Sequence, residues 1–166
     1  MAIVLTRIDD RLIHGQVVEG WLKKIRITHI IVVSDEIVRD QMQKTLIGMA
    51  APSNVRVSAF SIEDAASRIK SDEFKKDFLL LLFSNPQDTL RFINSGVKLK
   101  SVNVGGMHYS AGKKQLLPNL SVDKADIGAF DEMHRLGVEL EARILPDDAR
   151  IDVECVINES NVRREQ

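Results

Sequence analysis

The sequence has little cysteine and no excess of either charge. Cys155 is the single cysteine among 166 residues, which excludes an internal disulfide framework. No basic segment followed by an apolar stretch opens the chain, so no secretory leader is predicted. The 23 Lys and Arg residues nearly balance 24 Asp and Glu residues, which gives no electrostatic reason to expect nucleic acid or a membrane surface as partner. We expect a soluble protein of the reducing cytoplasm.

Long hydrophobic runs are also missing. The longest covers residues 78–83, far short of the roughly 20 residues that span a bilayer. It therefore predicts a strand buried on both faces and no direct membrane insertion. A chain of this length supports one self-sufficient core. We predict a single domain over residues 1–166, in which the segment after Pro146, above all the last ~15 residues, has no clear pattern.

Apolar runs of strand length alternate with segments of helical period. Strands are predicted at residues 3–8, 27–33, 55–60, 78–83, 100–104 and 138–144. Helices are predicted at 16–25, 36–49, 62–69, 85–94 and 123–136, with a polar loop through residues 105–121. Ser34-Asp35, Ser61, Asn85 and Asp123 are the expected helix caps.

This alternation predicts an α/β fold, namely a doubly wound, mostly parallel sheet with helices on both faces. Ligands bind such sheets beyond the carboxyl ends of the strands. The loop after the first strand, residues 9–15, is therefore the first place to look for a site.

Several common phosphate sites are missing. No Gly-x-Gly-x-x-Gly motif follows the first strand, and no Gly-x-x-x-x-Gly-Lys-Ser/Thr loop occurs. Asp9-Asp10 and Ser84 are similar to parts of response-regulator receiver domains. However, the third strand lacks a terminal Asp at residues 59–61, and the fifth ends in glycines 105–106 where a receiver has Lys. We expect no nucleotide cofactor and no metal.

The loop instead combines an imidazole, a guanidinium and carboxylates. His14 can accept a phosphoryl group if one ring nitrogen is unprotonated and a carboxylate, Asp9 or Asp10, takes the proton of the other. Arg11 offers a planar fork for phosphoryl oxygens, and Gly15 allows close approach to the start of a helix. In proteins generally, however, such a histidine is more often an ordinary packed or capping residue, and the acids and Arg11 equally suit turn or helix-cap acids and a solvated charge. Local chemistry leaves both interpretations open.

A family resemblance favours the first interpretation. The segment from residue 7 to residue 17, Arg-Ile-Asp-Asp-Arg-Leu-Ile-His-Gly-Gln-Val, resembles the active-site loop of IIB components of the bacterial sugar phosphotransferase system, in the mannose/fructose/sorbose family. Segments 31–36, 44–46, 81–86, 101–107, 112–115, 121–123 and 137–140 resemble the family in the same order. The resemblance therefore covers nearly the whole chain.

This resemblance implies a phosphocarrier, that is, a protein-histidine phosphate:sugar phosphotransferase. A IIA protein would donate a phosphoryl group from its phosphohistidine to His14, which would pass it to a sugar imported by membrane IIC and IID partners. By the same match, Arg11 would hold the phosphate, and Asp9 would orient the ring so that phosphate sits on Nδ1. The chain would be cytoplasmic and peripherally associated with the membrane through IIC and IID. The sugar is not specified.

Two alternatives stay open at this point. A IIB-like chain can act as a regulatory phosphoprotein, which sequence alone does not separate from a transport component. A phosphate-ester hydrolase would use Asp9, Asp10 and His14 as metal ligands, but a divalent ion needs more ligands than this loop predicts.

Secondary candidates lie at the ends of neighbouring strands. Ser84 and Asn85 are predicted either to bind the phosphate or to cap the helix that begins at Pro86. His108 follows the fifth strand without a nearby acid or Arg in the sequence, so it is a poor second acceptor. Lys113 or Lys114 is a candidate contact for an acidic partner. Other residues have structural interpretations: Trp21 in the core or a docking surface, Cys155 as a small buried side chain, and His29 and His134 as structural and surface residues.

Overall fold

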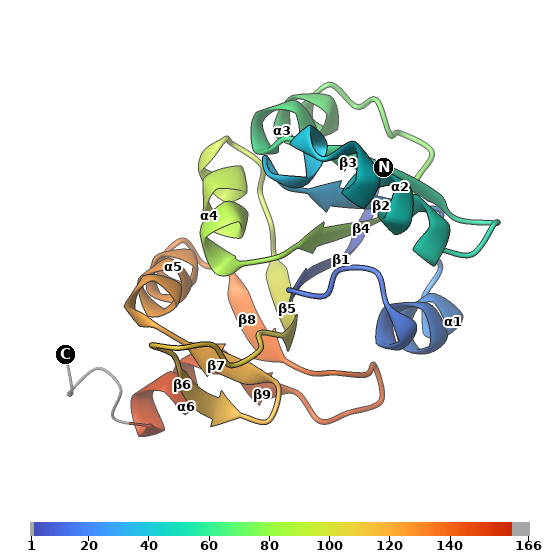
Figure 1. Cartoon of the computed structure of the whole chain (residues 1–166). Coiled ribbons are helices and arrows are strands. Elements are labelled where there is room, and N and C mark those ends of the chain that lie inside the picture. Colours follow the sequence, from blue (N-terminus) through green and yellow to red (C-terminus); the bar gives the residue numbers. More distant parts are fainter. Residues whose placement is uncertain (1, 161–166) are drawn as a thin grey trace.

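The computed structural model describes residues 2–160, which contain a seven-stranded sheet (Figure 1). Its strands are β1 (Ala2–Asp9), β2 (His29–Val33), β3 (Arg56–Phe60), β4 (Phe78–Phe83), β5 (Ser101–Gly106), β8 (Glu139–Ala142) and β9 (Ile151–Asp152). Their spatial order is β3-β2-β4-β1-β5-β8-β9, and every neighbouring pair is parallel except β8 and β9. This confirms the predicted doubly wound, mostly parallel α/β fold.

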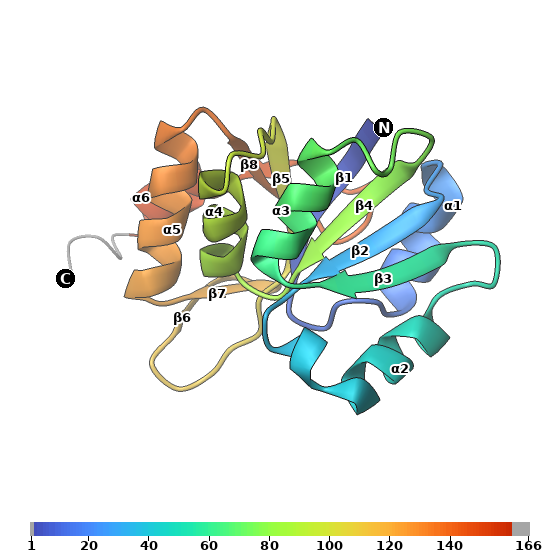
Figure 2. The same ribbon diagram turned by 90° about the horizontal axis from the view of Figure 1, so that it is seen from above.

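Helices cover both faces of the sheet (Figure 2). The π-helix η1 (Gln16–Trp21), its continuation α1 (Leu22–Lys24), the short helix η2 (Ile37–Arg39) and α2 (Gln41–Ala50) lie on one face. On the other lie α3 (Ile62–Lys70), α4 (Pro86–Asn94), α5 (Lys124–Arg135) and α6 (Val153–Glu159). A small hairpin of β6 (Lys114–Leu117) and β7 (Leu120–Val122) forms a separate two-stranded sheet, and a bridge between Met107 and Leu120 links it to the end of β5.

The centre of the core is β4, as its apolar run predicts. Residues 79–83 are completely buried. Their side chains alternate between the two hydrophobic clusters, one on each face of the sheet. Phe83 meets Phe92 of α4 edge to face, with ring centroids 5.3 Å apart. Because β4 pairs with β1 up to Phe83 opposite Ile8, this rigid strand supports the start of the first loop.

Phe92→Ala is expected to lower the free energy of unfolding by about 3–5 kcal/mol, because it leaves a cavity at a fully buried position. Urea denaturation of the variant beside the unchanged chain measures this loss. A change below about 1 kcal/mol would contradict the packing described for α4.

Most predicted helix boundaries are confirmed by their caps. Ser61, Asn85 and Asp123 each accept a hydrogen bond from the backbone N–H three residues ahead, at the start of α3, α4 and α5. Gly96 and Gly137 follow α4 and α5 with φ of +94° and +84°, a conformation that favours glycine.

The continuous helix predicted over residues 36–49 is wrong. Asp40 has extended backbone angles and separates η2 from α2, and its side chain caps α2 by accepting from Gln43 N. Ser34 accepts from Ile37 N at the start of η2. Asp35 instead accepts from Ile62 N of α3, so it caps a different helix.

Two further sequence interpretations need correction. The expected polar loop contains the β6–β7 hairpin, and the tail without clear pattern forms β9 and α6 as far as Glu159. Cys155 is exposed rather than buried, because α6 turns Val153 and Ile157 toward the core, and residue 155 lies between them on the opposite side. Residues 161–166 of the tail lie outside the described residues.

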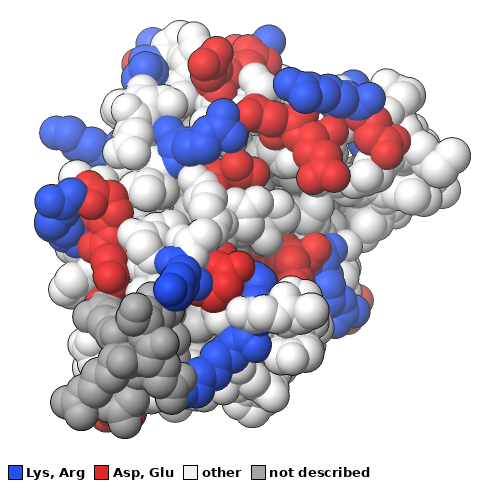
Figure 3. Space-filling model, turned by 60° about the vertical axis from the view of Figure 1, so that its left-hand side comes forward, with Lys and Arg blue, Asp and Glu red and all other residues white. Residues whose placement is uncertain are grey.

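The face of the molecule drawn in Figure 3 shows no dominant charge. Figure 3 shows Lys and Arg side chains interspersed with Asp and Glu over one face, in line with the near balance of charges in the sequence. Across residues 2–160, no helix is both long enough and apolar enough to cross a membrane.

Candidate functional site

The site begins where β1 ends, at the centre of the sheet between β4 and β5. Asp9 closes the strand and organises the loop with both its backbone and its side chain. Its carbonyl accepts from Leu12 N at 2.9 Å, and its Oδ1 accepts from Arg11 N at 3.1 Å. Leu12 has φ of 56°, a left-handed conformation that is unfavourable for a branched side chain. The loop is therefore a tight, strained turn built around Asp9.

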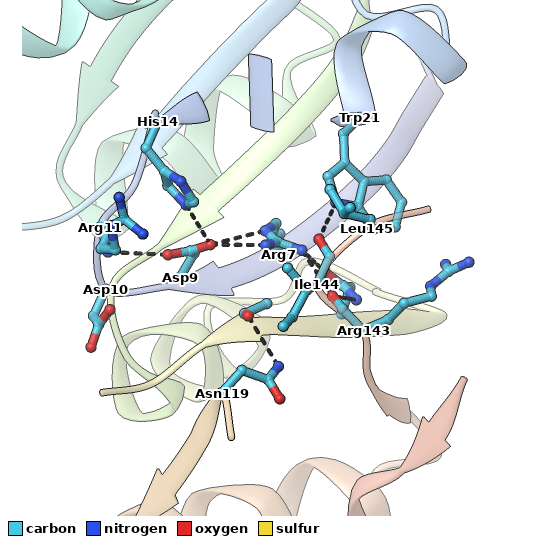
Figure 4. A network of polar contacts seen from close by, with 12 residues as sticks. Arg7, Asp9, Asp10, Arg11, His14, Trp21, Asn119, Arg143, Ile144 and Leu145 are labelled. Atoms are coloured by element: carbon cyan, nitrogen blue, oxygen red, sulfur yellow. Dashed lines mark hydrogen bonds and ion pairs between the residues drawn. The ribbon is translucent and has the colours of Figure 1, made fainter. Parts of the chain in front are cut away.

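His14 is held by this same carboxylate. Its Nε2 lies 2.8 Å from Asp9 Oδ2, and the side chains of His14 and Asp9 are 9% and 1% exposed. An ionised carboxylate accepts hydrogen bonds only, so this contact places a proton on Nε2. In the neutral ring, Nδ1 then keeps its lone pair. Figure 4 shows the His14 ring pointing toward the Asp9 carboxylate.

Arg11 and Gly15 border a hollow next to the ring. The hollow has a volume of about 460 Å³ and is lined by Arg11, His14, Gly15, Gln16, Glu19, Gly20 and Leu145. Arg11 and Gly15 are exposed, and a Cβ built on Gly15 would meet no atom within 4 Å. A phosphoryl group in the hollow would thus meet an imidazole edge, a guanidinium and the first turn of η1.

Arg7 is a site residue that sequence reasoning did not identify. Its side chain is fully buried, with Nε and Nη2 donating to Asp9 Oδ2 at 3.2 and 2.9 Å (Figure 4). Burial lowers the pKa of Arg7, and the Asp9 carboxylate acts to raise it. The signal that could have found it is the strand period, which puts residues 7 and 9 on one face.

Trp21 is confirmed as a core residue, because it is 3% exposed and donates Nε1–H to Ile144 O at 2.9 Å. The guanidinium carbons of Arg7 and Arg143 lie 5.5 and 4.9 Å from its ring centroid. Trp21 thereby joins the first helix to the segment after β8, which carries Leu145 of the hollow.

Asp10 points to the other side of the loop and meets His108. His108 Nδ1 lies 2.6 Å from Asp10 Oδ1, and His108 N donates to Asp10 Oδ2 at 2.7 Å. His108 has no acid near it in the sequence, as noted above, but the fold brings Asp10 to it from nearly one hundred residues away. The pair ties the loop after β1 to the loop after β5.

Ser84 and Asn85 follow β4, beside β1 as expected. The Asn85 side chain accepts from Asp88 N at 2.8 Å and donates to Ser84 Oγ at 3.1 Å. The cap is therefore present, while neither residue lines the hollow beside His14. Binding of phosphate by Ser84 and Asn85 stays a prediction.

The other candidates have local partners. His29 is buried, its Nε2 lies 2.9 Å from Ser58 Oγ, and burial lowers its pKa. Lys113 donates to the buried Asp126 at 2.8 Å, and His134 is exposed. Within the described part of the chain, no three His, Cys, Asp or Glu side chains gather closely enough to hold a metal ion.

Comparison with known families decides the class of protein. The family model described as "PTS system sorbose subfamily IIB component" matches residues 3–166. The chain belongs to this family. The match confirms the sequence resemblance and places this IIB chain in phosphoryl transfer within a sugar phosphotransferase system.

Relatives support the same assignment. The IIB chain is 47% identical over 152 residues to the fructose-specific EIIB component of Bacillus subtilis, covering 92% of this chain and 93% of the relative. It is 40% identical over 158 residues to the mannose-specific EIIAB component of Escherichia coli, covering 95% of this chain and 49% of the relative. The crystal structure of the IIBSor domain of the sorbose permease from Klebsiella pneumoniae matches with a TM-score of 0.91 and 39% identity, covering 96% and 98% of the two chains.

Proposed function

We propose that His14 accepts a phosphoryl group on Nδ1 from the phosphohistidine of a IIA protein and transfers it to a sugar. The observation that carries the proposal is the 2.8 Å contact between Nε2 and the buried Asp9 carboxylate. A ring fixed in this way has one nitrogen with a lone pair, and this nitrogen belongs to a ring that borders a hollow.

Arg11 supplies the charge that this reaction needs. Its backbone N–H is fixed by Asp9, while its side chain borders the hollow. A phosphoryl group in transfer spreads negative charge over three oxygens, and a guanidinium fork stabilises that charge. Gly15 leaves open space on the helix side of the same hollow. The roles of Asp9, Arg11 and Gly15 are thus orientation, charge stabilisation and access.

The two transfers are in-line displacements at phosphorus. In the first, the bond from phosphorus to the donor imidazole breaks as the bond to His14 Nδ1 forms. In the second, the Nδ1–phosphorus bond breaks, a sugar hydroxyl oxygen bonds to phosphorus, and the hydroxyl proton is released. Exchange between two imidazoles is nearly balanced in energy, so the protein mainly contributes position and charge.

Membership of the family supports a proposal for the partners. The match to about half of a mannose-specific EIIAB component supports a IIA donor, because that relative joins a second part to its IIB-like half. We propose that membrane IIC and IID components present the sugar, and that this chain associates peripherally with the membrane through them. The family match favours this carrier over a metal-dependent phosphate-ester hydrolase.

The test is a reconstituted transfer. The chain is incubated with phosphoenolpyruvate, the general phosphotransfer proteins and a IIA protein, and then with membranes that contain IIC and IID and a panel of sugars. We expect one phosphoryl group per chain, acid-labile and alkali-stable, which leaves the protein as sugar phosphate when membranes and sugar are added. The control omits IIA.

Two outcomes would contradict the proposal. Label that forms equally well without IIA would remove the proposed donor. Label that forms but never reaches any sugar in active membranes would point to the regulatory phosphoprotein.

Addition of a chelator is expected to leave the transfer from phosphorylated IIA to His14 unchanged.

A further inference from the structure

The deepest charge at the site belongs to Arg7, whose guanidinium has no exposed surface. It donates four hydrogen bonds inside the protein: two to Asp9 Oδ2, one to Asn103 Oδ1 at 2.5 Å and one to Arg143 O at 3.1 Å. A buried charge is costly unless it is paired and hydrogen-bonded in this way. The Arg7 guanidinium is therefore bonded to Asp9, Asn103 and Arg143, and Arg7 does not belong to the residues that line the hollow.

The fold makes room for this guanidinium. In the sheet, Arg7 lies opposite Asn103 of β5, and a Cβ built on Gly105 would lie 1.8 Å from Arg7 Cζ. The ring of Trp21 covers the guanidinium from the first helix. Residues of β5 and of the first helix thus enclose the Arg7 guanidinium beside Asp9.

Arg7 and His14 share one acceptor atom. Both contact Asp9 Oδ2, at 2.9 Å from Arg7 Nη2 and at 2.8 Å from His14 Nε2. A carboxylate that faced only an imidazole would favour the imidazolium, because an opposite charge stabilises the charged ring. An imidazolium carries protons on both nitrogens and has no lone pair to attack phosphorus.

We propose that Arg7 is a positioning residue that compensates the charge of Asp9 and thereby holds His14 as the neutral, Nε2-protonated imidazole. The guanidinium is permanently charged, so the carboxylate can orient the ring without protonating it. This inference rests on the proposed role of His14 as phosphoryl acceptor. It adds the reason why the carboxylate beside the ring does not protonate it and thereby remove the lone pair that attacks phosphorus.

The surrounding charges are mostly paired with one another. Asp10 pairs with His108, and Glu19 pairs with Lys23 on the first helix. From β8, Glu141 pairs with Arg143 behind Arg7. Arg11 faces the hollow from the same loop. Arg7 is thus the cation in direct side-chain contact with Asp9 among the described residues.

The experiment compares Arg7→Gln with Arg7→Lys, and uses Arg26→Gln as the matched control. Arg26 stacks on Phe78, 4.5 Å from its ring centroid, so it is an Arg that packs on an aromatic ring without contacting Asp9. Nitrogen NMR of the His14 ring in unphosphorylated protein reports its tautomer and the pH at which it gains its second proton. The pH profile of phosphoryl acceptance from IIA is recorded for the same variants.

In Arg7→Gln, protonation of the ring is expected at a pH about one unit higher than in the unchanged chain, and acceptance below that pH falls about tenfold and recovers at higher pH. Arg7→Lys keeps the charge and is expected to retain most of the profile, as is Arg26→Gln. The double variant with Arg7→Gln and Asp9→Asn lacks the carboxylate as well. In this variant the rise in the pH of ring protonation is expected to disappear.

An unchanged ring titration in folded Arg7→Gln would overturn the proposal, as would a loss of acceptance that no pH restores. If Arg7→Gln does not fold, Asn103→Ala, which removes one anchor of the guanidinium, gives the same readout. In Asn103→Ala, a rise in the pH of ring protonation that is smaller than the one expected for Arg7→Gln supports the proposal, and an unchanged pH contradicts it. Failure of the unchanged chain to accept phosphate would instead refute the proposed function, because the ring titration does not depend on phosphorylation.

Discussion

His14→Ala is expected to abolish phosphoryl acceptance completely. The substitution removes the ring that borders the hollow, and the bonds of Arg7 to Asp9 remain to hold the end of β1. The measurement is the mass of the intact protein after incubation with phosphoenolpyruvate, the general phosphotransfer proteins and IIA. His14→Gln, which keeps an N–H donor for Asp9, is expected to be equally inactive.

The matched control for this prediction is His108→Ala. His108 is also an imidazole beside a carboxylate, but Asp10 holds it through Nδ1 and it is 62% exposed. We expect the His108 variant to accept phosphate as the unchanged chain does. Label that persists in folded His14→Ala and disappears in His108→Ala would transfer the acceptor role to His108.

Arg11→Ala is expected to slow acceptance by about 10²–10³-fold, because removal of one charge-stabilising donor in a transfer site costs about this much. The stability of the fold should change little, since Arg11 is exposed and Asp9 holds the loop through the Arg11 backbone N–H, which the variant keeps. Single-turnover transfer from phosphorylated IIA measures the rate, and urea denaturation measures the stability.

Arg11→Lys separates charge from shape. If Arg11→Lys slows phosphoryl acceptance as much as Arg11→Ala does, the planar fork is required. A smaller loss of rate in Arg11→Lys indicates that a positive charge suffices. Full activity of both variants would remove Arg11 from the mechanism. A rate loss accompanied by an equal loss of folded protein would show that Arg11 acts on the loop and not on the phosphate.

Local patterns were enough to predict the sheet and the loop. The apolar run at residues 78–83 coincides with β4, and Ser61, Asn85 and Asp123 mark helix starts because their side chains cap backbone N–H groups within one turn. The association of Asp9, Arg11 and His14 was also predictable, because all three lie within six residues at the end of one strand.

Features that depend on distant partners were not predictable. Arg7 is identified as part of the site only once β1 lies beside β5, which brings Asn103 and Gly105 against it. Likewise Asp10 meets His108 across the same strand pair. Single-sequence patterns carry no information on strand register, so these contacts required the structure.

Errors in element boundaries have a different cause. The apolar periodicity over residues 36–49 continues through Asp40, yet capping of α2 by the Asp40 side chain interrupts the helix. The β6–β7 hairpin was missed because its first strand is half-exposed and opens with Lys114 and Gln115, which give no buried alternation.

The central claim is that Asp9 holds Nε2 of His14 and leaves Nδ1 to carry the phosphoryl group. Nitrogen–phosphorus correlation NMR of the phosphorylated, isotope-labelled chain identifies the bonded nitrogen directly. We predict a single correlation to Nδ1 of His14, with Nε2 protonated. A phosphorus coupled to Nε2, or to any other residue, would contradict the account.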